Sequence, residues 1–346
     1  MRTKITELLG IQHPIIQSAM GWIANKELVC AVCNAGALGL LAVGGVTPDE
    51  LRTLIREIRG TIGDRPFGVN ITPHRPGFVH HIEVLLEEKI PVWNSGLRDP
   101  FSYLNVEKPE GVIFIPTVGS VGQAIKMEQA GADAVIVQGW EAGGHAGRIA
   151  SSVLIPEVAE AVNVPVIAAG GFCDGKGLVA AMALGAEGIS MGTRFATAAE
   201  SPLFQHIKLE YVKARDKDAE VSSVFDGLPM RAIRGEKMRH YLGWWTQFWR
   251  VLPALISIKK TYKASFRDII ESSRIVMGMG ASLPQFLMGM ETYRYVFTTG
   301  DFKRGYSPAG QVTGRIKDIP TSREIIERIV SEAEQIIRSM PSAIEG

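Results

Sequence analysis

The chain of 346 residues has almost no net charge and no long apolar run. Its 37 Lys and Arg residues nearly balance 36 Asp and Glu, which gives a formal net charge of +1 and excludes the strongly basic surface of typical nucleic-acid-binding proteins. The longest apolar stretches, such as Gly36 to Val46, fall well short of the roughly 18 to 20 residues that span a bilayer. We therefore expect no nucleic-acid partner and no transmembrane segment, and a small molecule as the partner.

Cysteine is also scarce. Three residues, Cys30, Cys33 and Cys173, are too few for a disulfide framework in a chain of this length, which favours a reducing compartment. The spacing of Cys30 and Cys33 suits a metal ligand pair, but a second pair is missing, so we expect no metal site. The N-terminal segment contains Glu7 and lacks the apolar region of a secretory signal. We predict a cytoplasmic location.

What the sequence does contain is a regular alternation of short apolar runs and helical patterns. The runs are Pro14 to Ser18, Ala37 to Ala42, Pro66 to Ile71, Ile90 to Asn94, Gly111 to Thr117, Ala134 to Gln138, Val164 to Ala169 and Gly188 to Met191. Most are apolar throughout, as in parallel strands that are covered on both faces. Eight such units predict an α/β fold, a (β/α)₈ TIM barrel.

A doubly wound open sheet would use the same units, but the glycines favour the barrel. The chain has 37 glycines, and many follow the ends of predicted strands: Gly21, Gly44, Gly96, Gly119, Gly139, Gly143, Gly144, Gly170, Gly171 and Gly192. In a doubly wound open sheet, the backbone approaches the ligand closely at one glycine-rich turn. Many glycine-rich strand ends indicate the mouth of a barrel.

The pattern changes after the eighth predicted strand. Residues 206–299 are helix-like, rich in methionine and aromatic residues, and without a convincing series of strands. We predict a smaller, mainly helical substrate or cap domain here, inserted into a barrel formed by residues 1–205 and 300–346. The role of its aromatic segment, Trp244 to Trp249, is left open among a channel wall, an oligomer contact, a membrane-surface helix and ordinary packing.

Two glycine turns follow the seventh and eighth predicted strands. Gly170 and Gly171 come after the seventh, and Gly192 and Thr193 after the eighth. In a barrel these two loops commonly bind phosphate, because glycine lets backbone N–H groups approach the anion closely. Thr193 adds a hydroxyl donor. The alternative is that these glycines only form tight turns.

A histidine follows the sixth predicted strand. Gly143 and Gly144 precede His145 and keep its approach to the barrel mouth open. Because histidine exchanges protons near neutral pH, His145 is the candidate catalytic group. The alternative is a structural or surface histidine.

Other residues at strand ends suit a flat heterocycle. Ala19 and Met20 follow the first strand and offer a small and a soft apolar contact. Asn70 ends the third strand and can bond a ring carbonyl or imide. Gln138 is a similar candidate, with the alternative that it ties loops together.

These motifs together resemble the nitronate monooxygenase family, also called 2-nitropropane dioxygenases, and its relatives, the FMN-dependent enoyl-acyl-carrier-protein reductases. The resemblance covers nearly the whole chain. Its segments are HPIIQSAMGWIANKEL, NAGALGLL, PFGVN, PTVGS, GADAVIVQGWEAGGHAG, VPVIAAGGFCDG, ALGAEGISMGTRF and SPAGQVTG.

The resemblance implies a barrel that carries FMN, with a smaller substrate domain inserted late. By motif match, the FMN phosphate is held by Gly170, Gly171, Gly192 and Thr193, and the flavin ring or ribityl chain is contacted by Ala19, Met20, Asn70 and Gln138. His145 is the active-site histidine, and Gly143 and Gly144 beside it are assigned to cofactor binding. Gly310 and Gln311 match a family segment near the flavin.

Two reactions follow from the resemblance, because both branches share the flavin site and the histidine. In the first, His145 takes the α-proton of a nitroalkane or steers the nitronate, and oxygen is consumed to give a carbonyl product and nitrite. In the alternative, NAD(P)H is a co-substrate and an enoyl thioester of acyl-carrier protein or CoA is reduced. A third, minor reading is a non-catalytic flavin-binding protein. A homo-oligomer is left open.

Overall fold

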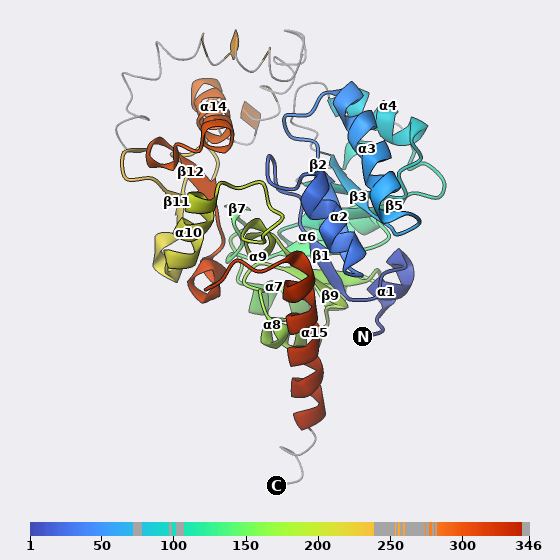
Figure 1. Cartoon of the computed structure of the whole chain (residues 1–346). Coiled ribbons are helices and arrows are strands. Elements are labelled where there is room, and N and C mark those ends of the chain that lie inside the picture. The colour runs from blue at the N-terminus through green and yellow to red at the C-terminus, as the bar shows by residue number, and fades with distance from the viewer. Residues whose placement is uncertain are drawn as a thin grey trace.

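The computed structural model describes residues 1–71, 78–96, 99–101, 107–238 and 282–340, with isolated positions between 253 and 280. Eight parallel strands form a closed barrel in chain order (Figure 1): β1 Ile15–Gln17, β2 Leu38–Ala42, β3 Gly68–Ile71, β4 Val92–Gly96, β5 Ile113–Val118, β6 Val135–Gln138, β8 Val166–Ala169 and β9 Gly188–Met191. The barrel closes where β9 pairs with β1, with Ile189 opposite Ile15. All eight predicted strands are confirmed, and the closure excludes the doubly wound sheet.

The apolar runs form strands because both of their faces are covered. Every residue of β2, β8 and β9 is buried. Residues such as Leu40, Ile136 and Ile167 fill the barrel interior together with Ile5 of α1, Lys4–Leu9. The alternate residues face the surrounding helices. The barrel is therefore a packed core whose cavity can lie only at one end.

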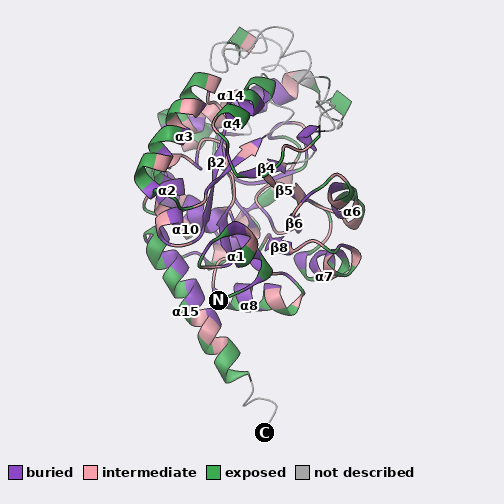
Figure 2. Cartoon of the chain, turned by 90° about the vertical axis from the view of Figure 1, so that its right-hand side faces the viewer, coloured by how far each residue is buried: buried purple, intermediate pink, exposed green. Residues whose placement is uncertain are grey.

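The helices of the ring carry buried inner and exposed outer faces (Figure 2). They are α2 Lys26–Asn34, α3 Pro48–Ile62, α4 Phe78–Glu87, α6 Val121–Gln129, α7 Ser151–Ala161, α8 Gly175–Ala183 and α15 Ser322–Ser339. The short helix α9, Thr193–Ala196, follows β9 and is buried throughout. Helix α3 begins at a reciprocal capping box that Thr47 and Glu50 form. Helix α15 is amphipathic and packs against α8 and α2, which completes the ring.

The inserted region contains strands as well as helices. Besides α10 (Gln205–Lys213) and α14 (Leu283–Thr299), it holds β10 (Glu220–Ser222) and β11 (Met230–Arg234). The sequence shows no convincing series of strands here, and these two strands were not predicted because they are short. Figure 1 shows α10, α14 and β11 on one side of the barrel.

Strand β11 pairs with three other strands in an antiparallel sheet. It pairs with β10, with β12 (Tyr306–Pro308) and with the two-residue β7 (Gly144–His145). This sheet joins strands of the predicted barrel domain to strands of the predicted inserted domain. The division into a barrel domain, residues 1–205 and 300–346, and an inserted domain, residues 206–299, stays a proposal. The segment 244–249 lies outside the described residues.

Within the described ranges, no helix has the length and apolar character needed to cross a membrane. Over the same residues, no group of three or more His, Cys, Asp or Glu side chains is arranged to hold a metal ion.

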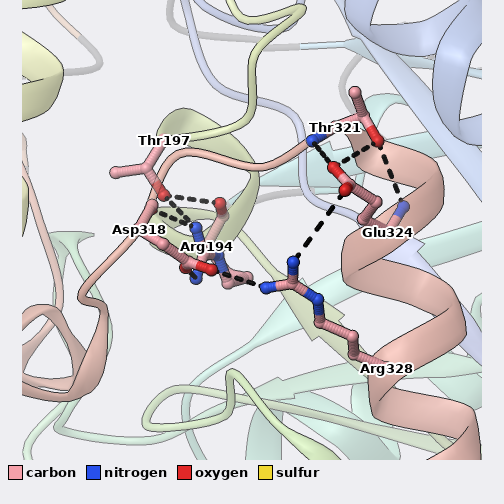
Figure 3. Close-up of polar contacts among 6 residues, drawn as sticks. All are labelled: Arg194, Thr197, Asp318, Thr321, Glu324 and Arg328. Carbon is pink, nitrogen blue, oxygen red and sulfur yellow. Dashed lines mark hydrogen bonds and ion pairs between the residues drawn. The ribbon is translucent and has the colours of Figure 1, made fainter.

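A polar network attaches α9 to the C-terminal helix (Figure 3). Arg194 donates from Nη1 to Asp318 Oδ1 at 2.8 Å and from Nη2 to Thr197 Oγ1 at 3.0 Å. Asp318 also accepts from Arg328 of α15 at 2.6 Å. Since α9 begins at the second predicted phosphate turn, the network fixes that turn against the ring. The Arg194 guanidinium group is engaged in these hydrogen bonds.

The same network sets the pKa of Asp318. Burial alone would raise that pKa, but the hydrogen bonds and charges of Arg194 and Arg328 outweigh it and lower the pKa below its ordinary value. A carboxyl group with a lowered pKa in the folded state stabilises the fold above its unfolded pKa of about 3.9, and this stabilisation is lost as the pH falls through the folded pKa.

Asp318→Asn should therefore lower the free energy of unfolding at pH 7, and the difference from the wild-type protein should shrink as the pH falls below about 4. Urea unfolding at a series of pH values measures this difference. Asp64→Asn, at an exposed position, is the matched control and should show little change at any pH. A difference for Asp318→Asn that stays constant down to acid pH would contradict the ion-pair account.

Helix α8 meets α15 at a glycine. A Cβ on Gly175 would lie 2.5 Å from Ala333 N and 2.7 Å from Ile329 O. The Gly175 N–H also donates to Glu332 Oε2 at 2.7 Å. Only glycine allows this approach, so the position is fixed by packing.

Gly175→Ala should destabilise the protein by about 1–3 kcal/mol, because the added methyl group overpacks the contact of the two helices. Gly60→Ala in α3 is the matched control: nothing lies within 4 Å of its Cβ position, and alanine should stabilise that helix by about 0.5–1 kcal/mol. Denaturant unfolding of the two variants measures whether each substitution lowers or raises the free energy of unfolding. Equal effects would show that the α8–α15 contact can relax.

Candidate active site

A cavity of about 680 Å³ lies at the carboxyl ends of the barrel strands. This volume falls in the usual range of small-molecule sites, about 300–1,000 Å³. Its lining includes nearly all of the residues predicted from the sequence: Ala19, Met20, Asn70, Gln138, Gly143, Gly144, His145, Gly170, Gly171, Gly192 and Thr193. The structure thus brings together residues from five strand ends of the barrel. Their roles stay predictions.

Gln311 is the predicted residue that does not line the cavity. Its backbone N–H donates to Glu141 O at 2.9 Å, and it begins the 3₁₀ turn Gln311–Arg315. Its neighbours Gly310 and Val312 do line the cavity. The segment is therefore placed at the site by its backbone, while the Gln311 side chain lies outside the lining.

The two glycine turns adopt the geometry expected of an anion cradle. Gly170 and Gly171 have φ values of +98° and +84°, a region that disfavours side chains. Within the described chain, the backbone N–H groups of Gly171 and Gly192 donate to no other residue. The Thr193 hydroxyl oxygen accepts from Gly310 N at 2.9 Å, which leaves its own proton to donate. Unpaired donors on glycine turns suit a phosphate group.

Buried contacts hold the loop that leads to the histidine. The Glu141 carboxylate accepts from Ser151 N at 3.1 Å and lies 2.8 Å from the Ser151 hydroxyl, at the first turn of α7. The same hydroxyl lies 3.0 Å from Gly170 O. Gln138 donates from Nε2 to His145 O at 2.6 Å. The loop-tying alternative for Gln138 is thus observed, and the residue lines the cavity as well.

His145 faces a carboxylate that the sequence analysis missed. Its Nε2 lies 2.8 Å from Oδ2 of Asp226, whose side chain is 6% exposed. Asp226 comes from the segment between β10 and β11, 81 residues away in the chain. It is near His145 because β7 pairs with β11, with His145 opposite Met230. No local pattern around Asp226 signals this contact.

An arginine of β11 also connects the inserted region to the loop that carries His145. Arg231 is buried; it donates to Trp140 O at 3.0 Å and to Ala219 O at 2.9 Å. Its guanidinium also lies 5.0 Å from the centre of the Trp140 ring. Burial lowers the pKa of Arg231, and the nearby Glu141 carboxylate opposes that shift. The cap and the histidine loop are therefore held together by charge as well as by the backbone.

A row of polar side chains crosses the base of the cavity. Asn70 donates from Nδ2 to Asn94 Oδ1 at 2.6 Å, and Asn94 donates in turn to Ile115 O at 2.7 Å. This chain fixes the orientation of both amides. Asn94 was missed in the sequence, although it stands near the end of a strand in the same way as Asn70.

The cap provides an apolar roof. Phe286, Met290 and Tyr293 of α14 line the cavity opposite the barrel. The Tyr293 hydroxyl donates to Gly21 O at 2.6 Å and attaches α14 to the loop after β1. A substrate enclosed here contacts polar groups of the barrel on one side and apolar side chains on the other.

The cysteine next to the first glycine turn is not a reactive thiolate. Burial, followed by the negative charge of Asp174, raises the pKa of Cys173 to about 11. The thiol is therefore protonated at neutral pH. His145 remains the group of this site that is suited to proton transfer.

The site fits the FMN that the sequence resemblance implies. Paired glycine turns with unpaired N–H donors suit the phosphate, and oriented amides beside the small residue Ala19 suit the edge of a flat ring.

The chain is similar to several known proteins. A family model described as nitronate monooxygenase matches residues 2–78 and 72–332. The chain is 36% identical to a Rhodococcus jostii enzyme, (3aS,4S,5R,7aS)-5-hydroxy-7a-methyl-1-oxo-octahydro-1H-indene-4-carboxyl-CoA dehydrogenase, over 96% of each chain. It is 32% identical to the "Probable nitronate monooxygenase" of Staphylococcus saprophyticus, over 70% of this chain and 82% of the relative. The solved structure of FabK from Thermotoga maritima has a TM-score of 0.81 and 35% identity, covering 99% of both chains.

Gly171→Val should reduce the retention of FMN, because the new side chain enters the cradle and strains a backbone with φ of +84°. Gly131→Val is the matched control: its φ is +87°, nothing lies within 4 Å of its Cβ position, and it is remote from the cavity. Visible flavin absorbance per protein chain after gel filtration measures retention. Equal flavin content in the two variants would remove Gly171 from the cofactor site.

Proposed function

The chain belongs to the nitronate monooxygenase family of flavin-dependent oxidoreductases, and on this basis we propose that it is an FMN-dependent enzyme that oxidises nitronates or nitroalkanes with O₂. The observation that carries the proposal is the placement of His145. It lines the cavity shared by the two glycine turns and is held against the buried Asp226. A proton-transfer group beside a flavin cradle is what oxidation of an acidic carbon centre requires.

In this proposal the residues act in three groups. The phosphate is held by the turns Gly170–Gly171 and Gly192–Thr193, and the ring and ribityl chain by Ala19, Met20, Asn70 and Gln138. When bound, FMN supplies the acceptor for electrons from the substrate carbon and their passage to oxygen. His145 removes the α-proton of a nitroalkane or orients the nitronate, and the apolar side chains of α14 exclude water.

A second candidate is reaction with an acyl thioester, with NAD(P)H as a co-substrate for enoyl reduction. A specific observation favours it: the relative named for a CoA substrate matches 96% of this chain, and the relative named for nitronates matches 70%. The apolar surface of Phe286 and Met290 suits the carbon skeleton of such a substrate.

The relatives are named as a dehydrogenase and a probable monooxygenase, so the non-catalytic reading is set aside. The choice of NADH or NADPH and a homo-oligomer stay open, and the cytoplasmic location stays a prediction.

Anaerobic mixing of the purified protein with NADH, NADPH, a nitronate and an enoyl-CoA in turn separates the two candidates. The proposed function predicts bleaching of the flavin spectrum by the nitronate, with nitrite release and oxygen uptake on admission of air. Bleaching by NAD(P)H, followed by reoxidation with the enoyl-CoA, selects the second candidate. A colourless protein without flavin absorbance would contradict both.

His145→Ala is the control for the site in this experiment. It should retain FMN and lower turnover by about 10²–10⁴-fold with a substrate whose proton must be removed. Undiminished turnover in this variant would take His145 out of the reaction.

A further inference from the structure

The two nitrogens of the His145 ring have different surroundings. Nε2 lies 2.8 Å from Asp226 Oδ2. For Nδ1, no hydrogen-bond partner occurs among the described residues. A carboxylate accepts hydrogen bonds, so Nε2 carries the proton and donates it to Asp226. The unprotonated Nδ1 is then the nitrogen left for a molecule in the cavity.

Both carboxylate oxygens of Asp226 accept hydrogen bonds from groups of the protein. Oδ2 accepts from His145, and Oδ1 accepts from the backbone N–H of Leu228 at 3.1 Å. The residue is 4% exposed. Rotation of the carboxylate would break two hydrogen bonds at a buried position, where an unpaired donor is costly.

Helix α14 holds the backbone of Asp226 in place. A Cβ on Gly289 would lie 2.3 Å from Phe225 O and 2.6 Å from Asp226 Cα. The helix therefore packs directly on this turn, and Gly289 is the residue that permits the approach. On the other side, Ala146 N donates to Pro229 O at 3.3 Å, next to the β7–β11 pair.

We propose that Asp226 is a positioning residue that keeps His145 in the Nε2-protonated tautomer, so that Nδ1 is the base of the reaction. Asp226 acts through the histidine. It sets which nitrogen carries the proton, and it stabilises the imidazolium that forms when the second proton arrives.

The activity part of this inference rests on the proposed nitroalkane chemistry. The Cα–H bond of the nitroalkane breaks, its electron pair moves into the nitro group to form the nitronate, and the proton goes to Nδ1. The imidazolium later releases that proton to solvent. A nitronate supplied as the anion has already lost the proton and does not need Nδ1 as a base.

The arrangement of the donors predicts the effect of an amide at this position. In Asp226→Asn, the oxygen of the amide stays opposite Leu228 N–H, since that donor needs an acceptor. The NH₂ group then faces His145 Nε2 and donates to it. The ring must adopt the Nδ1-protonated tautomer, which removes the base from the cavity side.

The test measures the tautomer and the kinetics separately. In protein labelled with ¹⁵N-histidine, ¹H–¹⁵N correlation spectra should show Nε2-protonated His145 in the wild-type protein and Nδ1-protonated His145 in Asp226→Asn. The signal is identified by its loss in His145→Ala. The variant should retain FMN, lose about 100-fold or more of kcat/KM with a neutral nitroalkane, and change less than about threefold with the preformed nitronate.

Asp218→Asn is the matched control, because Asp218 lies in the same inserted region with an exposed side chain, and it should behave as wild type. An Nδ1-protonated His145 in the wild-type protein overturns the proposal. Equal losses with nitroalkane and nitronate also overturn it, since they indicate a structural role. If the wild-type protein turns over neither compound, the proposed function fails, while the tautomer spectra still decide the role of Asp226.

Discussion

The site depends on a short backbone contact between two parts of the chain that are distant in sequence. β7 consists of two residues, and its antiparallel pairing with β11 sets His145 opposite Met230 and Gly144 opposite Arg231. The barrel alone provides glycine turns and a histidine on a loop. The pairing gives that histidine a buried carboxylate partner. Helix α14, which packs on the turn that carries this carboxylate, provides the roof of the cavity. The pairing acts through backbone hydrogen bonds, which depend little on the identity of the side chains.

The barrel was predictable from the sequence because its signals are local and repeated. A run such as Leu38 to Ala42 is buried on both faces, so its composition alone identifies a parallel strand. The start of α3 at Thr47 was also readable, because a capping box lies within four consecutive residues. Glycines after strand ends indicated the mouth, since a close approach to a ligand excludes side chains.

The cap and the partner of His145 were not predictable, because their signals are neither local nor repeated. β11 alternates Met, Arg, Ala, Ile and Arg, and it becomes a strand only because β7, β10 and β12 pair with it. Asp226 is an ordinary aspartate in a turn until that pairing brings it to His145. Gln311 shows a related limit: a motif match singled out its segment, but only the fold shows that its neighbours line the cavity while Gln311 does not.

The ends of the inserted region are attached to each other near the barrel. His206 Nε2 of α10 donates to the carbonyl of Gly300, which ends α14, at 2.7 Å across 94 residues. A segment closed at its base can change in length at small entropic cost, about 0.6 kcal/mol for each doubling of a flexible loop. Evolution can therefore replace the roof of the cavity while the glycine turns and their supports stay intact. One cofactor scaffold can in this way give rise to enzymes with unrelated substrates, and new specificities can be engineered between these two anchor points.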